Sequence, residues 1–158
     1  MRSGTVMKQV IVFHSGDQSF ALNIEHIDKI IEFETPNIVP ETKKYVKGVL
    51  KYHGKILPII DLYERLYGES QEKKDTAKII VVKFKETHIG LVIDNIVGIK
   101  NYEDDQFEDP VQFEDKFSKE YVEGFIKEDE DIIILMNPRK LFSFSEAHAL
   151  AQLEDGIA

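Results

Sequence analysis

The chain contains no cysteine, so thiol chemistry is excluded and the first candidates for metal binding or acid–base chemistry are histidines and carboxylates. No two histidines stand four residues apart, and none belongs to an H-E-x-x-H motif, so the spacing does not indicate a catalytic metal. The acidic stretch from Asp104 to Asp115 lacks the central glycine and the alternation of an EF-hand loop. We therefore expect no metal and no cofactor. The five histidines are His14, His26, His53, His88 and His148.

Motifs for phosphate binding and nucleophilic catalysis are also missing from the sequence: it has no P-loop, no G-x-G-x-x-G after a strand and no G-x-S-x-G elbow. Asp61 and Asp94 stand at the ends of expected strands, where an acid could be catalytic in principle. Capping of a following helix is the simpler role for Asp61. The sequence therefore predicts a binding protein and not an enzyme.

Charge is unevenly distributed along the chain, whose formal net charge is −9. The segment from Glu103 to Asp131 holds thirteen carboxylates against three lysines. Such an acidic belt repels phosphate backbones and anionic lipids, so it disfavours nucleic-acid and membrane-surface binding. No apolar run reaches the length of roughly 20 residues that a membrane helix needs. Together with the lack of cysteine, these features predict a cytoplasmic protein.

Short apolar runs separated by turn residues predict a strand-rich chain. Hairpins are expected over residues 9–22, 45–60 and 79–93, and two more strands over residues 121–136. Isoleucines at helical spacing after Asn23 predict a short helix that contains Ile27 and Ile30. A second short helix is expected after Asp61, with Glu64 completing a capping box.

The sequence contains an internal repeat. Tyr45-Val46-Lys47-Gly48 matches Tyr121-Val122-Glu123-Gly124 at an offset of 76 residues, and the earlier segments match at an offset near 69. Such a repeat predicts a mainly β fold of two SH3-like five-stranded barrels that share a hydrophobic core, with short helices. We expect the first unit at about 8–68, a linker at 69–77, the second unit at about 78–142 and a C-terminal helix or tail at 143–158. Strand exchange between the units is left open.

Three separated motifs give the chain a resemblance to a known family. The segment from Gly48 to Leu62 looks like the motif G-x-x-N-L-R-G-x-x-x-P-x-x-D-L, and Gly90–Ile96 resembles G-L-x-V-D-x-V. Tyr121–Gly124 and the segment from Ile132 to Leu141 resemble the closing strands and terminal helix of the same family. In order and spacing, residues 8–150 resemble the CheW coupling proteins of bacterial chemotaxis.

The resemblance implies two SH3-like barrels without catalysis that bridge transmembrane chemoreceptors to the histidine kinase CheA, at receptor clusters on the inner face of the membrane. For contact with the regulatory domain of CheA it points to Gly48 and Gly54, and Phe113 would suit a second contact. Where the family has N-L-R, this chain has Lys51-Tyr52-His53, so His53 would take the place of an arginine near receptor contacts. His53 could equally be a simple turn residue before Gly54.

For the hairpin tip of the receptor we expect a hydrophobic groove between the two units, lined by Ile27, Ile30, Val92 and Ile96. Docking of a helix in a groove uses apolar anchors of this kind. The alternative is that these four residues belong to the core. Two other functions stay open: a CheW-like scaffold in a two-component pathway outside chemotaxis, and a small-barrel nucleic-acid-binding protein.

Overall fold

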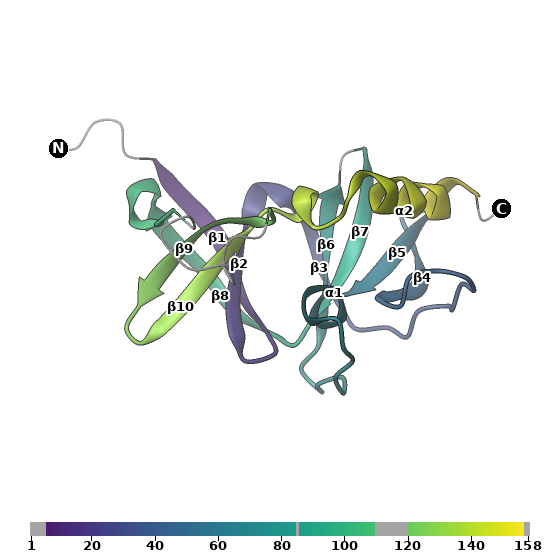
Figure 1. Cartoon of the computed structure of the whole chain (residues 1–158), viewed down its shortest axis with the longest axis horizontal. Helices are drawn as coiled ribbons and strands as arrows, with labels where there is room; N and C mark the ends of the chain where they lie inside the picture. The colour runs from purple at the N-terminus through teal and green to yellow at the C-terminus, as the bar shows by residue number, and fades with distance from the viewer. Residues whose placement is uncertain (1–5, 85, 110–119, 157–158) are drawn as a thin grey trace.

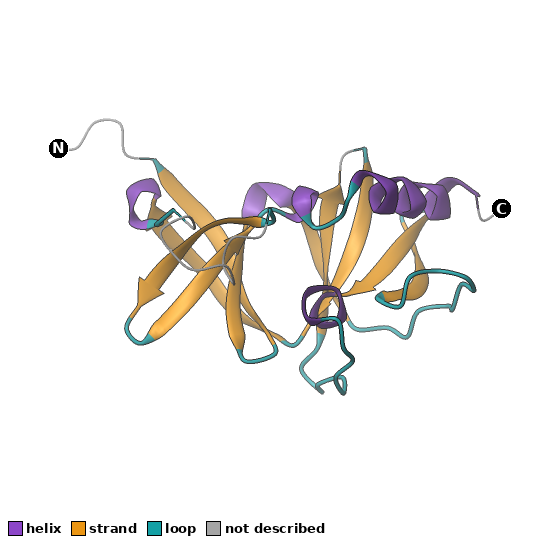
Figure 2. Ribbon diagram, viewed as in Figure 1, coloured by secondary structure: helices purple, strands orange, loops and turns teal. Residues whose placement is uncertain are grey.

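The computed structural model describes residues 6–84, 86–109 and 120–156. Strands dominate it, and they form two separate five-stranded sheets with few short helices (Figures 1 and 2). The expected mainly β fold is therefore confirmed. The strands are β1 (Met7–Ser15), β2 (Gln18–Asn23), β3 (Ile27–Glu32), β4 (Val46–Tyr52), β5 (Lys55–Asp61), β6 (Lys78–Phe84), β7 (Thr87–Ile93), β8 (Asn95–Glu103), β9 (Val122–Glu128) and β10 (Asp131–Met136). The helices are η1 (Ile24–His26), α1 (Leu62–Tyr67), η2 (Asp104–Gln106), η5 (Pro138–Lys140) and α2 (Phe144–Gly156).

Strand order shows that the two sheets are not consecutive halves of the chain. Sheet A has the order β8-β1-β2-β10-β9, and sheet B has the order β3-β6-β7-β5-β4. The expected division into units at 8–68 and 78–142 is therefore corrected, because each repeat lends its first hairpin to the sheet of the other. The hairpins β1–β2 and β6–β7 join their new sheets through the parallel pairs β2–β10 and β5–β7. Strand exchange follows from this pairing.

Alternation of side chains along the strands divides the core into three parts. In β1, β2 and β10, one face packs inside sheet A and the other faces sheet B; the strands of sheet B alternate in the same way. The largest cluster lies between the sheets and is shared by them, as the repeat predicted. Its largest fully buried members include Phe13, Leu22, Ile60, Phe84 and Leu91.

Equivalent backbone contacts recur at the two ends of the repeat. The carbonyl oxygen of Tyr45 accepts a hydrogen bond from the Asp61 amide at 2.9 Å, and that of Tyr121 accepts one from the Asn137 amide at 2.7 Å. Both pairs are related by the offset of 76 residues that the sequence shows. The internal repeat is thus a repeat of structure.

The helix expected after Asn23 is wrong in extent. Only the three residues of η1 are helical, and the chain then continues as β3 through Ile27 and Ile30. Four isoleucines stand at helical spacing, which led to the prediction of a helix. Their β-branched side chains favour the extended backbone instead. The capping box expected at Asp61 is also absent: Asp61 makes no side-chain capping bond, and Glu64 is buried beside the ammonium group of Lys47.

Helix α2 lies over sheet B and forms the C-terminal helix expected in residues 143–158 (Figure 1). A reciprocal pair of bonds starts it: the Glu146 carboxylate accepts from the Ser143 amide at 2.9 Å, and the Ser143 hydroxyl accepts from the Glu146 amide at 3.2 Å. The Tyr45 hydroxyl donates to Glu146 at 2.6 Å and so ties the helix to the start of β4. Among the described residues, no helix is long and apolar enough to cross a membrane.

Candidate functional site

Large aliphatic side chains are exposed on β8 of sheet A and on the adjoining η1. Ile99 on β8 is 61% exposed, Val97 is 46% exposed and Ile24 in η1 is 38% exposed. Ile11 of β1, which is buried, pairs with Ile99, and η1 also contacts β1. We call these four residues the β8 patch. An exposed cluster of large aliphatic side chains is typical of a protein interface.

A β-bulge gives the β8 patch its shape. Val12 pairs with Gly98 while the next residue, Phe13, pairs with Ile96, so Val97 is the extra residue of β8. Bulges alter the register of a strand pair, and on β8 the exposed positions are Val97, Ile99 and Asn101. Gly98 accepts the unusual backbone with φ of 153°.

The structure brings together three of the four residues predicted for the receptor groove. Ile27, Ile30 and Ile96 are half-buried and pack against the shared core at the edge of the two sheets. Val92 instead packs against the interior of sheet B, because it pairs with Ile79 on the opposite face. The groove as predicted therefore does not form around Val92. Receptor binding by the other three residues stays a prediction.

His53 and Gly54 form the tight turn between β4 and β5. Both have positive φ, 50° and 76°, as the turn of a two-residue hairpin requires. The His53 ring is exposed and lies 4.3 Å, centroid to centroid, from the ring of Tyr52. His53 is therefore a turn residue in the structure, and its exposed ring leaves the predicted receptor contact open.

The neighbouring Tyr52 fastens this hairpin to β3. Its hydroxyl donates a hydrogen bond to Asp28, which lies 3.9 Å from the imidazole of His88. Burial, reinforced by the bond to Asp28, raises the pKa of Tyr52 to about 12. The same bond lowers the pKa of Asp28, so the carboxylate stays ionised near neutral pH. This pair closes the gap between the two edge strands of sheet B.

Gly48, predicted to contact a kinase, lies near the start of β4, and Gly54, predicted to do the same, lies in the turn after its end. Four residues of strand and His53 lie between them, a span of roughly 15 Å. Gly48 is buried beneath the segment that crosses β4, where the Asn37 amide donates to the Val49 carbonyl at 2.9 Å. A side chain at Gly48 would collide with the Asn37 carbonyl oxygen, so packing alone accounts for this glycine. Gly54 has open space around it.

The crossing segment carries a feature that the sequence analysis missed. Ile38, next to Asn37, is 86% exposed, the most exposed large hydrophobic residue in the described chain. Its neighbours Pro36 and Pro40 restrict the backbone of this extended stretch. A signal was present in the sequence, since an isoleucine flanked by turn residues has no strand partner. Phe113, the remaining kinase prediction, lies outside the described residues.

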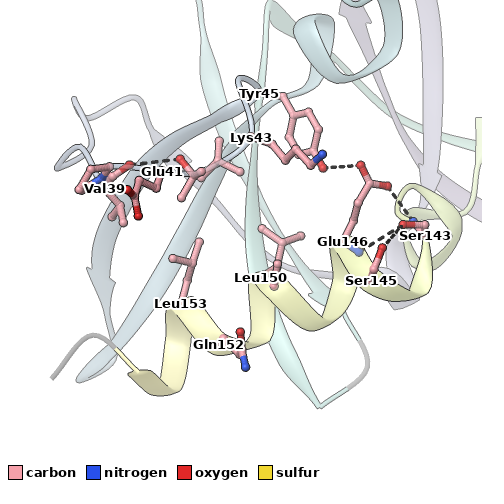
Figure 3. Close-up of a pocket in the computed structure, with 14 residues that line it drawn as sticks. Val39, Glu41, Lys43, Tyr45, Ser143, Ser145, Glu146, Leu150, Gln152 and Leu153 are labelled. Atoms are coloured by element: carbon pink, nitrogen blue, oxygen red, sulfur yellow. Dashed lines mark hydrogen bonds between the residues drawn. The ribbon is translucent and has the colours of Figure 1, made fainter.

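A groove runs between this crossing segment and α2 (Figure 3). Its volume is about 1230 Å³, and Leu150 and Leu153 of the helix point into it across from Val39. Glu146 lies at one end, where it is bound by Tyr45 and Ser143. The hydrogen bond from Tyr45, together with those from Ser143, outweighs burial and lowers the pKa of Glu146. The groove thus has an apolar floor, and its acidic group is already paired.

Buried acids elsewhere have structural partners and not the arrangement of a catalytic pair. Asp94 is bound to the Gly16 amide at 3.0 Å and the Gln71 side chain at 2.7 Å. Glu64 is paired with Lys47. Burial raises the pKa of Asp61, but that carboxyl faces no nucleophile or histidine in the described contacts. Within residues 6–84, 86–109 and 120–156, no group of three or more histidines and carboxylates could hold a metal ion.

The sequence and the structure of the chain are similar to those of known proteins of one family. A model of the CheW-like domain matches residues 9–146. A chemotaxis protein CheW from Thermotoga maritima is 28% identical over 133 residues, which cover 84% of this chain and 86% of that protein. A probable chemotaxis protein CheW from Rhizobium etli is 28% identical over 142 residues, covering 90% of this chain and 92% of that protein.

A solved structure agrees with the sequence matches. The crystal structure of the scaffolding protein TtCheW from Thermoanaerobacter tengcongensis aligns with a TM-score of 0.80 and 25% identity. The alignment covers 89% of this chain and 96% of that one. Family model, relatives and fold agree over nearly the whole length, and the chain belongs to the CheW-like domain family.

Proposed function

We propose that this chain is a non-catalytic adaptor of bacterial chemotaxis that couples transmembrane chemoreceptors to the histidine kinase CheA. An adaptor needs two accessible faces, one for each partner. The observation that carries the proposal is the presence of two separate exposed apolar surfaces: the β8 patch on sheet A and Ile38 on sheet B. Membership of the CheW-like family supports it, as do relatives named as chemotaxis proteins.

The β8 patch is the proposed receptor face. It continues the edge of the shared core, where Ile27, Ile30 and Ile96 are half-buried, so a helical hairpin could pack on both sets of side chains. Helix docking of this kind relies on apolar anchors in a groove. The proposed occupant is the cytoplasmic hairpin tip of a chemoreceptor, which would recruit the adaptor to receptor clusters at the inner face of the membrane.

The β4 edge of sheet B is the proposed kinase face. Asn37, the residue before the exposed Ile38, lies over Gly48 near the start of β4, and the turn of His53 and Gly54 follows the end of that strand. An exposed aliphatic anchor beside an edge strand offers apolar contact to a partner. The regulatory domain of CheA is the proposed partner, and Phe113 remains a candidate for a second contact.

Two charge substitutions test the division of labour. Ile99→Asp places a charge in the β8 patch and Ile38→Asp places one on the β4 edge; both positions are exposed, so the free energy of unfolding should change little. A charge in a desolvated apolar contact weakens binding by about a hundredfold or more. In pull-downs with a receptor cytoplasmic fragment and with CheA, each variant should lose only its own partner.

Ile30→Asp is the informative companion variant. Ile30 packs against the shared core, so this change should lower thermal stability as well as receptor binding. If Ile30→Asp melts like wild type, or if Ile99→Asp binds receptor normally, the proposed receptor face is wrong. Loss of both partners by one exposed variant would argue against two independent faces.

The absence of catalysis is tested separately. Purified protein should change CheA autophosphorylation only when receptor is present, and should neither hydrolyse ATP nor accept a phosphoryl group. Stoichiometric phosphotransfer to this chain would contradict the proposal.

A further inference from the structure

Asp94 is a single residue that links the two sheets. It stands between the last residue of β7 in sheet B and the first residue of β8 in sheet A. Only 8% of it is exposed, although it carries a carboxylate. A buried carboxylate is costly unless hydrogen bonds compensate for the lost water, so its partners indicate what the residue does.

Four hydrogen bonds converge on Asp94 from three parts of the chain. One carboxylate oxygen accepts from the Gly16 amide in the β1–β2 turn at 3.0 Å, and the other accepts from the Gln71 side chain at 2.7 Å. The Asp94 amide donates to the His14 carbonyl at 2.9 Å, and its own carbonyl accepts from the Thr76 hydroxyl at 2.7 Å. A turn of sheet A and the linker before β6 are therefore bound to the same crossover residue.

Gly16 brings a second contact between the sheets to the same place. It has φ of 65°, and a Cβ atom on it would lie 2.8 Å from the ring of Tyr63 in α1. The turn thus lies between the Asp94 carboxylate and an aromatic ring of the helix that follows β5. Hydrogen bonds are directional, whereas the apolar core that the sheets share is held by a non-directional force.

We propose that Asp94, Gly16 and Tyr63 form a joint that fixes the angle between the two sheets. If the adaptor function proposed above is correct, the joint also fixes the angle between the receptor face and the kinase face. The β8 patch begins three residues after Asp94, and β7 pairs directly with β5, whose turn carries His53 and Gly54. A loosened joint would leave each binding face intact and weaken the coupling between them.

The test measures the angle without any partner. Because the chain has no cysteine, spin labels can be placed at two engineered cysteines, Asn101→Cys on β8 and Lys83→Cys on β6, both exposed positions. Wild type should give one narrow distance distribution by pulsed electron paramagnetic resonance. Asp94→Ala should broaden it at least twofold while circular dichroism stays that of a folded β protein. An unchanged distribution would overturn the proposal.

Matched variants separate the joint from simple charge or backbone effects. Asp17→Asn removes a carboxylate from the exposed tip of the same β1–β2 turn and should leave the distribution narrow. Gly16→Ala should broaden it, whereas Gly68→Ala should not: Gly68 has φ of 77° but open space around it. Equal broadening in both glycine variants would count against the joint.

Milder variants cover the case in which Asp94→Ala does not fold. Asp94→Asn keeps the shape and loses one acceptor, and Gln71→Ala removes only the linker bond; each should broaden the distribution less than twofold. A narrow distribution in both variants would overturn the proposal.

The functional consequence is measured separately. With receptor and CheA, Asp94→Asn should bind each partner within about twofold of wild type but lower receptor-dependent kinase activity about tenfold. If the wild-type protein binds neither the receptor nor CheA, the proposed adaptor function is wrong, whereas the distance measurements still test the joint.

Discussion

Sheets A and B follow the same plan but differ in charge and in how tightly their crossing segments pack. In each, an extended segment crosses the last hairpin and bridges to the residue after a glycine: Asn37 to Val49 in sheet B, and Glu108 to Phe125 in sheet A. Each sheet also closes its two edge strands with a bond between a tyrosine and a carboxylate. Duplication thus explains the architecture, and the differences show where each sheet has specialised.

The two closing bonds are related by the repeat, but the tyrosine and the carboxylate have exchanged places: Tyr52 of β4 is equivalent to Glu128 of β9. In sheet B, Tyr52 of β4 donates to Asp28 of β3. In sheet A, Tyr102 of β8 donates to Glu128 of β9, at the position equivalent to Tyr52, and Lys100 binds the same carboxylate at 2.5 Å. The geometry of closure is retained although the residues differ, which indicates that closure is needed in both sheets.

The largest expected effect comes from the two equivalent glycines. Gly48→Ala would force a side chain onto a backbone oxygen and demands φ of 140°, whereas the new Cβ of Gly124→Ala would lie 2.9 Å from the Glu108 carbonyl oxygen without such a φ. We expect Gly48→Ala to lower the free energy of unfolding by about 3–5 kcal/mol and Gly124→Ala by about 1–2 kcal/mol. Urea denaturation measures both.

Gly54→Ala is the control for backbone strain alone, because Gly54 has positive φ and no neighbour within contact distance. It should cost about 1 kcal/mol. Equal costs for Gly48→Ala and Gly124→Ala would mean that the two crossings are equally tight and that sheet B does not require glycine at this position more strictly than sheet A.

A smaller effect is expected from breaking the two closures. Glu128→Gln should lower stability by about 1 kcal/mol at pH 7 and Asp28→Asn by about half as much, since both side chains are more than one-third exposed and solvent screens them. Glu128 loses a lysine and a tyrosine partner, while Asp28 loses mainly Tyr52. Thermal melts of the two variants compare the closures directly.

The pH dependence of these costs has a defined sign. Bonds from Lys100 and Tyr102 lower the pKa of Glu128 in the folded state, and the bond from Tyr52 lowers that of Asp28. A lowered pKa adds stability above the unfolded value and loses it as the pH falls through the folded value. Both differences from wild type should therefore shrink below about pH 4. Costs that persist at pH 3 would show that charge is not their source.

The sequence predicted the architecture better than the connections. Gly48 and Gly124, with the tyrosines three residues before them, revealed the repeat. A segment crosses close to each of these positions, so each requires a glycine, and that glycine is recognisable in the sequence. Exchange of the β1–β2 and β6–β7 hairpins was not predictable, since pairing between distant strands leaves no trace in local spacing. The error at Ile27 and Ile30 has a similar cause: four isoleucines fit a helix by spacing and a strand by side-chain shape.

The candidate faces were harder to predict than the fold. Ile96 and Ile99 look alike in the sequence, yet Ile96, opposite Phe13, packs half-buried against the shared core, whereas Ile99, opposite Ile11, is exposed. Val92 was assigned to the wrong face for lack of a register. Exposure depends on where strands lie beside one another, and only the three-dimensional structure gives that.

The smallest effect concerns charge. Residues 7–26, 95–109 and 120–137, which build sheet A, hold thirteen carboxylates and three lysines; the described residues of sheet B and α2 hold fourteen carboxylates and thirteen basic residues. Self-repulsion in sheet A should fall when salt shortens the screening length from about 30 Å at 0.01 M to about 5 Å near 0.5 M. Amides of β8 and β9 should then exchange hydrogen more slowly, by a factor of about two to five, while those of β3 and β4 change little.

Hydrogen exchange with mass spectrometry resolves the two sheets in one experiment. Sucrose at matched osmolality controls for general compaction, and Glu123→Gln, which removes an exposed charge from β9, should mimic part of the salt effect. Screening also weakens the ion pair between Lys100 and Glu128, which opposes the expected change. Slower exchange in sheet A alone would mean that repulsion outweighs that pair; equal responses would show that the charge difference has no effect on stability.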